Sequence, residues 1–296
     1  MMRRTVVVTV VIGAASALSS ILSPAAAQSS DNSASPVHLQ EGRDQPNTEL
    51  RYDLPLDLTI TASGAAIALS LELLAPKLAP STCHWCDRDA NGTDTLNGFD
   101  ASIRSHVRWS DTAAADKAST VIGYGLAPLA AAGVGTLLAA HDHRLSEVPV
   151  DALVVAEATV IALNINQVSK FLFARQRPEV HFRSPEQRAE DNLSFYSGHT
   201  TFAFALGTSA GTVASMRRYQ LAPIIWIGGI LLAAATGYLR IAADQHYATD
   251  VISGAVMGSA VGFGIPYFVH HPTAASIRLT AMPSPGGGGL AVSGQW

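Results

Sequence analysis

Three short polar clusters stand at the ends of apolar segments, and together they could handle a phosphate group. In the first, Lys170 and Arg177 are seven residues apart, so on a continuous helix both cations would lie on one face. The second is Ser197-Gly198-His199, directly before an apolar run. A helix that begins there would direct free N–H groups at a bound anion, with a histidine beside it.

The third cluster contains Arg240, His246 and Asp250. One helical turn separates the last two, so the carboxylate could hydrogen-bond the imidazole, fix its tautomer and favour its protonated form. Each cluster alone has an ordinary explanation, such as cations at a helix C-terminus or a histidine used as a cap. The three together predict a phosphate site at which histidine does the chemistry.

The order and spacing of these clusters resemble the three-part signature of the type 2 phosphatidic acid phosphatase (PAP2) superfamily. That superfamily includes class A acid phosphatases, lipid phosphatases and vanadium haloperoxidases. The matching motifs are Lys170-x6-Arg177-Pro178, Ser197-Gly198-His199 and Arg240-x5-His246-x3-Asp250. Two positions depart from the family pattern: Tyr196 stands where proline is usual, and Leu239 where serine is usual.

The resemblance implies a core of six helices and a reaction without a metal ion. His199 would attack phosphorus to form a phosphohistidine, and His246 would serve as general acid and then as general base. Asp250 would orient His246. The phosphate oxygens would be held by Lys170, Arg177, Arg240, Ser197 and Gly198.

The expected function is therefore hydrolysis of a phosphate monoester or pyrophosphate, with a phosphorylated lipid or small phosphate ester as substrate. Two alternatives stay open: a soluble periplasmic acid phosphatase of broad specificity, and a vanadate-dependent haloperoxidase. We expect no metal and no cofactor, vanadate excepted under the second alternative. A net charge of −4 excludes a basic nucleic-acid binder.

The elements that must carry these clusters are apolar and helical. Charged residues make up only 14% of the chain, against roughly 25% in ordinary soluble domains. Apolar stretches, several near the length of about 20 residues that crosses a bilayer, cover residues 58–78, 121–140, 150–173, 200–215, 221–239 and 249–269. No segment before the C-terminus alternates convincingly with period two, which predicts an all-α PAP2-like bundle of about six apolar helices. Because Glu72 and Pro76 interrupt the first stretch, we expect it to lie at the interface or inside the bundle rather than to cross.

The chain divides into five expected parts. Arg3 and Arg4, the uncharged apolar run Thr5–Leu22 and the small residues at 25–27 are typical of a signal peptide, residues 1–27. The later parts are a flexible polar lead (28–55), an N-terminal helix with a polar segment (56–118), the PAP2-like core (119–271) and a tail (272–296). In the tail, short strands around Gly286–Gly289 suggest a β-hairpin, with a disordered tail as the alternative.

The two cysteines, Cys83 and Cys86, are expected to form a disulfide, because a zinc site would need two further ligands. We expect a bacterial envelope protein in the inner membrane with its site facing the periplasm, or else a soluble periplasmic protein. Arg144 and Arg217 in the opposite loops favour the first orientation. A cleaved signal followed by six crossings would instead place the site inside, which conflicts with it.

Overall fold

The computed structural model describes residues 48–183, 188–272, 276–284 and 287–295. It separates into two compact units: Thr48–Pro272 is one, and the C-terminal hairpin belongs to the other. The predicted signal peptide and most of the polar lead lie outside the described residues.

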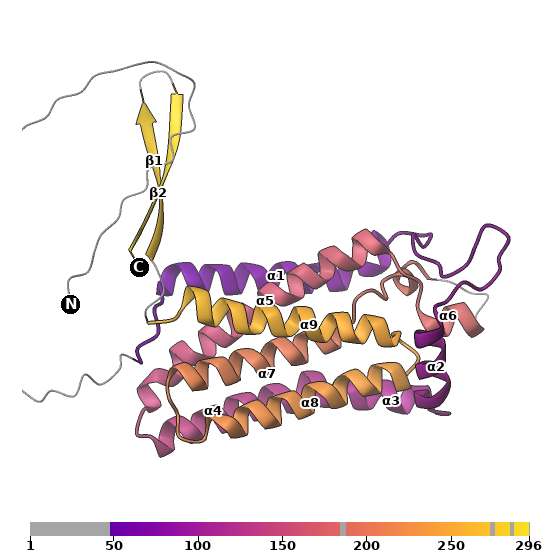
Figure 1. The fold of residues 1–296 in the computed structure, drawn as a ribbon, viewed down its shortest axis with the longest axis horizontal. Coiled ribbons are helices and arrows are strands. Elements are labelled where there is room, and N and C mark those ends of the chain that lie inside the picture. The colour runs from indigo at the N-terminus through magenta and orange to yellow at the C-terminus, as the bar shows by residue number, and fades with distance from the viewer. Residues whose placement is uncertain (1–47, 184–187, 273–275, 285–286, 296) are drawn as a thin grey trace, which may run out of the picture. The chain divides into compact units, whose positions relative to one another are not determined.

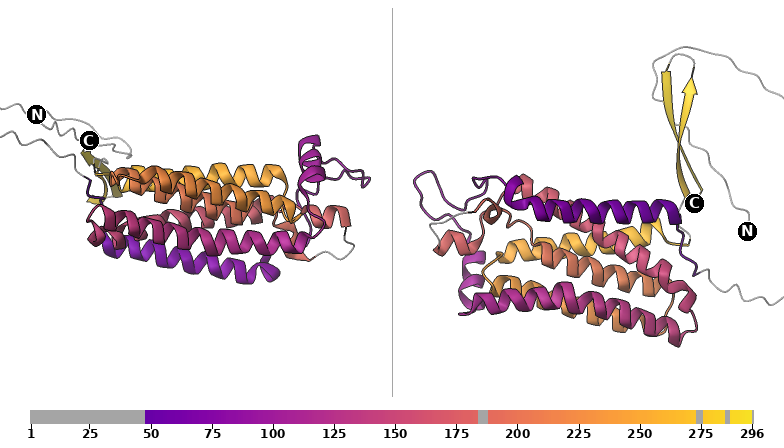
Figure 2. Two further views of the ribbon diagram at one scale, coloured as in Figure 1. Left: turned by 90° about the horizontal axis from the view of Figure 1, so that it is seen from below. Right: turned by 180° about the vertical axis from the view of Figure 1, so that it is seen from behind.

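Within Thr48–Pro272, long helical segments run side by side along one direction (Figures 1 and 2). In chain order these segments are α1 (Leu54–Leu78), α3 (Thr112–Thr120) continued by η1 (Val121–Leu126) and α4 (Ala127–His141), α5 (Val148–Phe173), α7 (Gly198–Met216), α8 (Ala222–Ala242), and α9 (Ala248–Gly264) continued by η4 (Ile265–Val269). Shorter helices are α2 (Gly98–Val107), η2 (Leu145–Glu147), α6 (Pro178–Arg183) and η3 (Ala189–Asn192). The predicted all-α bundle is confirmed.

Helix α7 lies at the centre of the bundle, and most of its residues are buried. Small residues let its neighbour α9 approach it closely. A Cβ added at Gly258 would lie 2.5 Å from the Thr201 carbonyl oxygen, and one at Gly262 would lie 2.5 Å from that of Ala205. This close packing holds the first two turns of α7 against the middle and last turns of α9.

The second expected helix is longer than the apolar stretch 121–140 that predicts it. The Asp111 side chain caps it by accepting a hydrogen bond from the Ala114 N–H at 2.9 Å, so the polar residues from Thr112 onward join the same helix. Helix α1 also differs from its expectation. It is 25 residues long, lies alongside α5 and is mostly exposed, so it is not packed inside the bundle.

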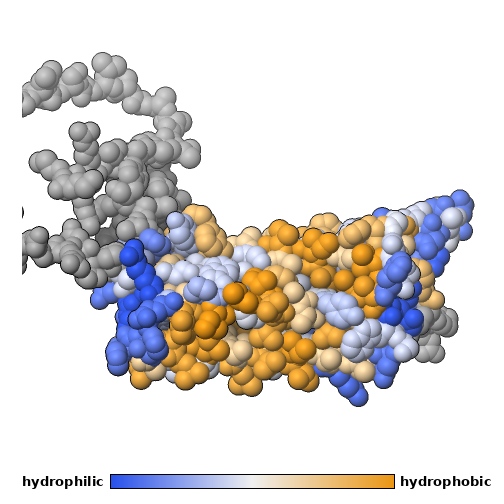
Figure 3. Space-filling view, turned by 60° about the horizontal axis from the view of Figure 1, so that its bottom comes forward, coloured by the Kyte–Doolittle hydropathy of each residue, from blue (hydrophilic) through white to orange (hydrophobic). Residues whose placement is uncertain are grey.

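On the face that Figure 3 shows, apolar residues cover the middle of the bundle and hydrophilic residues gather at its two ends. Large apolar side chains of several helices are widely exposed, among them Leu73, Leu129, Leu172, Leu231 and Phe268. A soluble monomer seldom exposes so large an apolar surface. Five helical segments are long and apolar enough to cross a bilayer: Leu54–Leu78, Thr112–His141, Leu145–Phe173, Ala222–Ala242 and Ala248–Val269. The chain is thus a helical membrane protein, which counts against the soluble alternative.

The C-terminal unit contains the β-hairpin that its sequence suggests. Strand β1 (Ser276–Ser284) pairs antiparallel with β2 (Gly287–Gln295), and Ser276 lies opposite Gln295.

Candidate active site

The predicted site residues meet at one end of the bundle, where α5 and α8 end and where α7 and α9 begin (Figure 1). Four different segments supply them, and alternate helices run in opposite directions. Clusters that are far apart in sequence therefore come together at the same end.

Three of these residues form a cation cluster, which consists of Lys170, Arg177 and Arg240. All three act electrostatically on both His199 and His246. The Lys170 Nζ atom lies beside the start of α7, only 3.2 Å from where a Cβ on Gly198 would be. The glycine therefore leaves room for the ammonium group beside the free N–H groups of a helix N-terminus, which is a favourable place for an anion.

Two donors of this cluster have no hydrogen-bond partner among the described residues, namely Nε of Arg177 and Nε of Arg240, both buried. Other nitrogens of the same guanidinium groups are engaged. Arg177 Nη1 donates to Gln245 Oε1, and Arg240 Nη1 pairs with Asp116 and lies 3.2 Å from Ser119 Oγ. Buried donors without partners are costly, and a bound phosphate oxygen would satisfy them.

Lys170 and Arg177 reach the site differently from the prediction. Helix α5 ends at Phe173, and Ala174 follows in a left-handed conformation with φ of 41°. Arg177 thus lies in the connecting segment, where its N–H donates to the Asp191 carbonyl at 2.9 Å, and Pro178 begins α6 instead of ending α5. The expectation of one continuous helical face is therefore wrong, although the structure brings both cations to one place.

His199 lies in the first turn of α7, immediately after Ser197 and Gly198. Its Nε2 atom is 3.3 Å from Thr120 Oγ1, and its ring packs against Tyr124 with centroids 4.4 Å apart. Tyr124 belongs to the π-helical turn η1, a local irregularity often found at functional sites. The Ser197 Oγ atom accepts a hydrogen bond from the Thr200 hydroxyl at 2.9 Å.

His246 is held in a single orientation and tautomer. Its Nδ1 atom lies 2.8 Å from the Ser194 carbonyl oxygen, which can only accept, so Nδ1 carries a proton and Nε2 is the nitrogen available for chemistry. Burial, and next the positive charge of the cation cluster, hold the pKa of His246 well below its usual range. In the free protein this imidazole is neutral at pH 7.

Asp250 does not hydrogen-bond His246 directly, contrary to the geometry expected from their spacing. Its Oδ2 atom is 3.8 Å from His246 Nδ1, whereas it accepts from the Ser194 hydroxyl at 2.6 Å and from the Tyr247 N–H at 3.0 Å. Because the carbonyl of Ser194 holds the imidazole, Asp250 can position His246 indirectly, through that serine and through the backbone of Tyr247. The roles assigned to the site residues stay predictions.

Arg175 is a central residue that the sequence reasoning missed. Its buried guanidinium donates to Asp250 at 2.7 Å, to Asp100 at 3.0 Å and to Asp87 at 3.0 Å. The rings of Trp85 and Tyr247 pack on it, with centroids 4.1 Å and 4.0 Å from its Cζ atom. Its partners lie far away in sequence, so periodicity gave no sign of this network.

Glu72 was also missed as a site residue. It extends from α1 toward Lys170, with which it interacts electrostatically, and Gln167 Nε2 donates to its Oε2 atom at 2.7 Å. An ionisable residue within an apolar segment is a signal of function in its own right. That signal was available in the sequence.

Cys83 and Cys86 form a disulfide in the segment that follows α1.

Of the two departures from the family pattern, Leu239 packs with Ala115, Ala242 and Ala243, between α3 and α8. The carbonyl of buried Tyr196 accepts a hydrogen bond from Asn166 at 2.7 Å, just before the start of α7.

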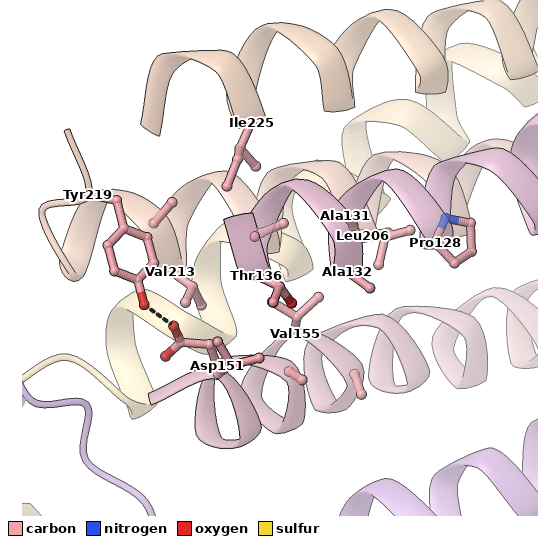
Figure 4. Close-up of a pocket in the computed structure, with 16 residues that line it drawn as sticks. Pro128, Ala131, Ala132, Thr136, Asp151, Val155, Leu206, Val213, Tyr219 and Ile225 are labelled. Carbon is pink, nitrogen blue, oxygen red and sulfur yellow. Dashed lines mark hydrogen bonds between the residues drawn. The ribbon is translucent and has the colours of Figure 1, made fainter. Parts of the chain in front are cut away.

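A separate cavity of about 230 Å³ lies between α4, α5, α7 and α8. Figure 4 shows its apolar wall, which includes Ala131, Val155 and Leu206, and at one end the hydrogen bond of 2.7 Å from Tyr219 to Asp151. None of the predicted phosphate-site residues lines it.

Known proteins share the part of the chain that carries the site. The family model of the PAP2 superfamily matches residues 151–273. An undecaprenyl-diphosphatase from Sulfolobus acidocaldarius is 32% identical over 104 residues, which are 35% of this chain and 48% of that protein. A lipid A 1-phosphatase from Porphyromonas gingivalis is 30% identical over 135 residues, which are 43% of this chain and 27% of that protein.

Among solved structures, a transmembrane PAP2-type phosphatidylglycerolphosphate phosphatase from Bacillus subtilis aligns with 69% of this chain and 93% of its own. Its TM-score is 0.42 and its sequence identity 16%. The matched segment spans about half of the first curated relative and about a quarter of the second. Every predicted catalytic and phosphate-binding residue falls between 151 and 273, the segment that matches the model of the PAP2 superfamily.

Proposed function

We propose that the protein is a membrane-bound phosphatase that hydrolyses a phosphate monoester or pyrophosphate of a lipid, without a metal ion, through a phosphohistidine. The observation that carries the proposal is the meeting of His199, His246 and the cation cluster at one end of the bundle. The curated relatives, named as phosphatases of undecaprenyl diphosphate and of lipid A, support a lipid substrate.

In the first step, an imidazole nitrogen of His199 attacks phosphorus and a P–N bond forms while the P–O bond to the leaving group breaks. The cation cluster and the N–H groups at the start of α7 stabilise the charge on the phosphoryl oxygens. His246 gives its Nε2 proton to the leaving oxygen.

His246 is neutral in the free protein, so this proton must be gained when substrate binds. A phosphate dianion offsets the positive charge of the cation cluster and thereby raises the pKa of His246. In the second step the neutral imidazole accepts a proton from water, the oxygen of that water attacks phosphorus, and the P–N bond breaks to release phosphate.

The test is phosphate release by detergent-purified protein from a panel of lipid and soluble phosphates, with EDTA present. We expect release from at least one lipid phosphate, and at least about a thousandfold loss in His199→Ala, because the nucleophile is absent. His106→Ala is the matched control, since His106 is exposed on α2. Activity that requires a metal, or that persists in His199→Ala, contradicts the mechanism.

The intermediate has a chemical signature of its own. Brief reaction with a substrate labelled at phosphorus, followed by denaturation, should leave label on the chain that survives alkali and is lost in acid. The label should be absent from His199→Ala. A vanadate-loaded protein that oxidises bromide would instead favour the haloperoxidase alternative.

We further propose that the site faces the periplasm of a bacterial inner membrane. The Cys83–Cys86 disulfide lies in the segment that follows α1, at the site end, and disulfides persist in oxidising compartments. Because α1 is long enough to cross, residue 54 then lies on the cytoplasmic side, which is incompatible with removal of 1–27 as a cleaved export signal.

Impermeant maleimide labelling of intact cells tests this orientation in a Cys83→Ser/Cys86→Ser background. Ser105→Cys at the site end should react, and Gln220→Cys at the opposite end should react only after lysis. Both positions are exposed, so access by reagent is the only variable. The reverse pattern would refute the proposed orientation.

A further inference from the structure

A second buried cluster of ionisable groups lies at the end of the bundle opposite the cation cluster. It consists of Asp57 in the first turn of α1, Glu157 in α5 and His270 after η4. All three side chains are buried. One ligand-type atom of each residue lies within 4.8 Å of those of the other two. The proposed phosphatase mechanism uses none of them.

The imidazole of His270 is oriented by the backbone. Its Nδ1 atom lies 2.8 Å from the Arg51 carbonyl oxygen, which accepts the Nδ1 proton, and the Arg51 N–H donates to the His270 carbonyl at 2.9 Å. In a neutral imidazole, Nε2 then holds a free lone pair. Histidines that bind metals are typically held in this way, with the other ring nitrogen donating to a carbonyl or carboxylate.

Two atoms that face into the cluster have no hydrogen-bond partner among the described residues, Nε2 of His270 and Oε2 of Glu157. They lie 3.7 Å apart, and their side chains are only 1% and 4% exposed. A charge-assisted hydrogen bond between imidazolium and carboxylate would bring these atoms to about 2.7–2.9 Å. The observed gap is therefore too wide for a proton shared between them.

The same gap suits a metal ion. Two ligand atoms that each lie about 2.1 Å from one ion are roughly 3–4 Å apart. The 3.7 Å between His270 Nε2 and Glu157 Oε2 falls in this range. Ligand atoms as far apart as the 4.8 Å limit of the cluster would have to approach by about 1 Å. Two buried carboxylates also exceed the single positive charge that one imidazole can carry, and a divalent ion would offset the difference. One imidazole and two carboxylates form a donor set that suits Zn²⁺ or Mn²⁺.

We propose that Asp57, Glu157 and His270 bind one divalent first-row transition-metal ion, which ties α1 to α5 and to the C-terminal end of η4. The Asp57 Oδ2 atom already accepts the Asp53 N–H at 2.9 Å, which orients this carboxylate. The ion is structural, because the cluster and the site histidines lie at opposite ends of the bundle (Figure 1).

The test uses the full chain in detergent, with an affinity tag that contains no histidine. The protein is treated with EDTA and reloaded with Zn²⁺ or Mn²⁺, and gel filtration then removes free metal. Elemental mass spectrometry measures the number of metal ions that stay bound per chain. We expect about one ion per chain, and an affinity at least about tenfold weaker in Glu157→Gln and in His270→Gln. His106→Gln, at an exposed histidine, is the matched control and should keep the ion.

Two further measurements guard against a variant that does not fold. The zinc K-edge absorption spectrum of the unmutated protein should show nitrogen and oxygen neighbours with an imidazole contribution and no sulfur. Zinc should also raise the thermal midpoint of the unmutated protein but not that of the conservative variant Asp57→Asn. If the folded, unmutated chain retains neither metal, or if the three ligand variants retain as much as it does, the cluster is an ordinary ion pair and the proposal is overturned.

Discussion

Replacing Arg175 with methionine should strongly destabilise the site end of the bundle, since it removes one cation from among three buried carboxylates. The guanidinium contacts Asp87, Asp100 and Asp250, and both it and the last two of these side chains are 0% exposed. Methionine has a similar length but no charge, so the three carboxylates would keep only neutral donors, such as the Ser194 hydroxyl, and would lose the positive charge that offsets them.

The magnitude follows from burial. Removing one partner of a buried ion pair costs about 3–5 kcal/mol, whereas an exposed pair contributes about 0–1 kcal/mol. For a domain of this size the loss corresponds to a fall in Tm of roughly 6–20 °C. Arg175→Lys should lose less, because an ammonium keeps the charge but cannot donate to three carboxylates in the same fixed geometry.

Thermal unfolding in detergent measures the effect, with Arg188→Met as the control. Arg188 pairs with Glu190 and Asp191, but its side chain is 69% exposed, so its loss should lower Tm by no more than about 2–4 °C. The reasoning is refuted if Arg175→Met unfolds within that same small margin while the three aspartates are unchanged.

Three further predictions concern phosphate chemistry. Gly198→Ala should lower kcat/KM by roughly 10- to 100-fold, because its Cβ would lie 3.2 Å from Lys170 Nζ, while Gly98→Ala, with open space around it, should be neutral. In pH profiles, the falling limb of kcat should lie at higher pH than the falling limb of kcat/KM, because bound substrate raises the depressed pKa of His246. Falling limbs at the same pH would contradict the mechanism. Glu72→Gln should tighten inhibition by inorganic phosphate about two- to fivefold by removing an anion near the cation cluster, whereas Glu147→Gln at the other end should leave it unchanged.

The sequence predicted which residues come together at one end of the bundle, because motif spacing and helix length can be read locally. Apolar stretches near the length of a bilayer predicted the bundle, and the alternating direction of successive helices explains why clusters 70 residues apart meet. The exact path of the backbone was less accessible. The left-handed turn at Ala174 separates Lys170 from Arg177, and nothing in the residue types there distinguishes it from a continuing helix.

Long-range polar networks could not be predicted for a different reason. Arg175 joins residues from the segment after α1, from α2 and from α9, and which carboxylates surround a buried arginine depends on the folded arrangement. The position of Asp250 illustrates this. A spacing of one turn allowed a direct bond to His246, but Arg175 and the Ser194 hydroxyl hold the carboxylate instead.

The charged groups around His246 determine how its imidazole would gain a proton. Arg175 forms an ion pair with Asp250 and so offsets much of the negative charge near His246. The Nδ1–H of His246 donates its hydrogen bond to a backbone carbonyl and not to a carboxylate. Little therefore stabilises the imidazolium before substrate arrives, while the cation cluster opposes it. In the proposed mechanism a phosphate dianion would reverse that balance, so the cations that attract the substrate would also make its binding raise the pKa of His246 and supply the acid.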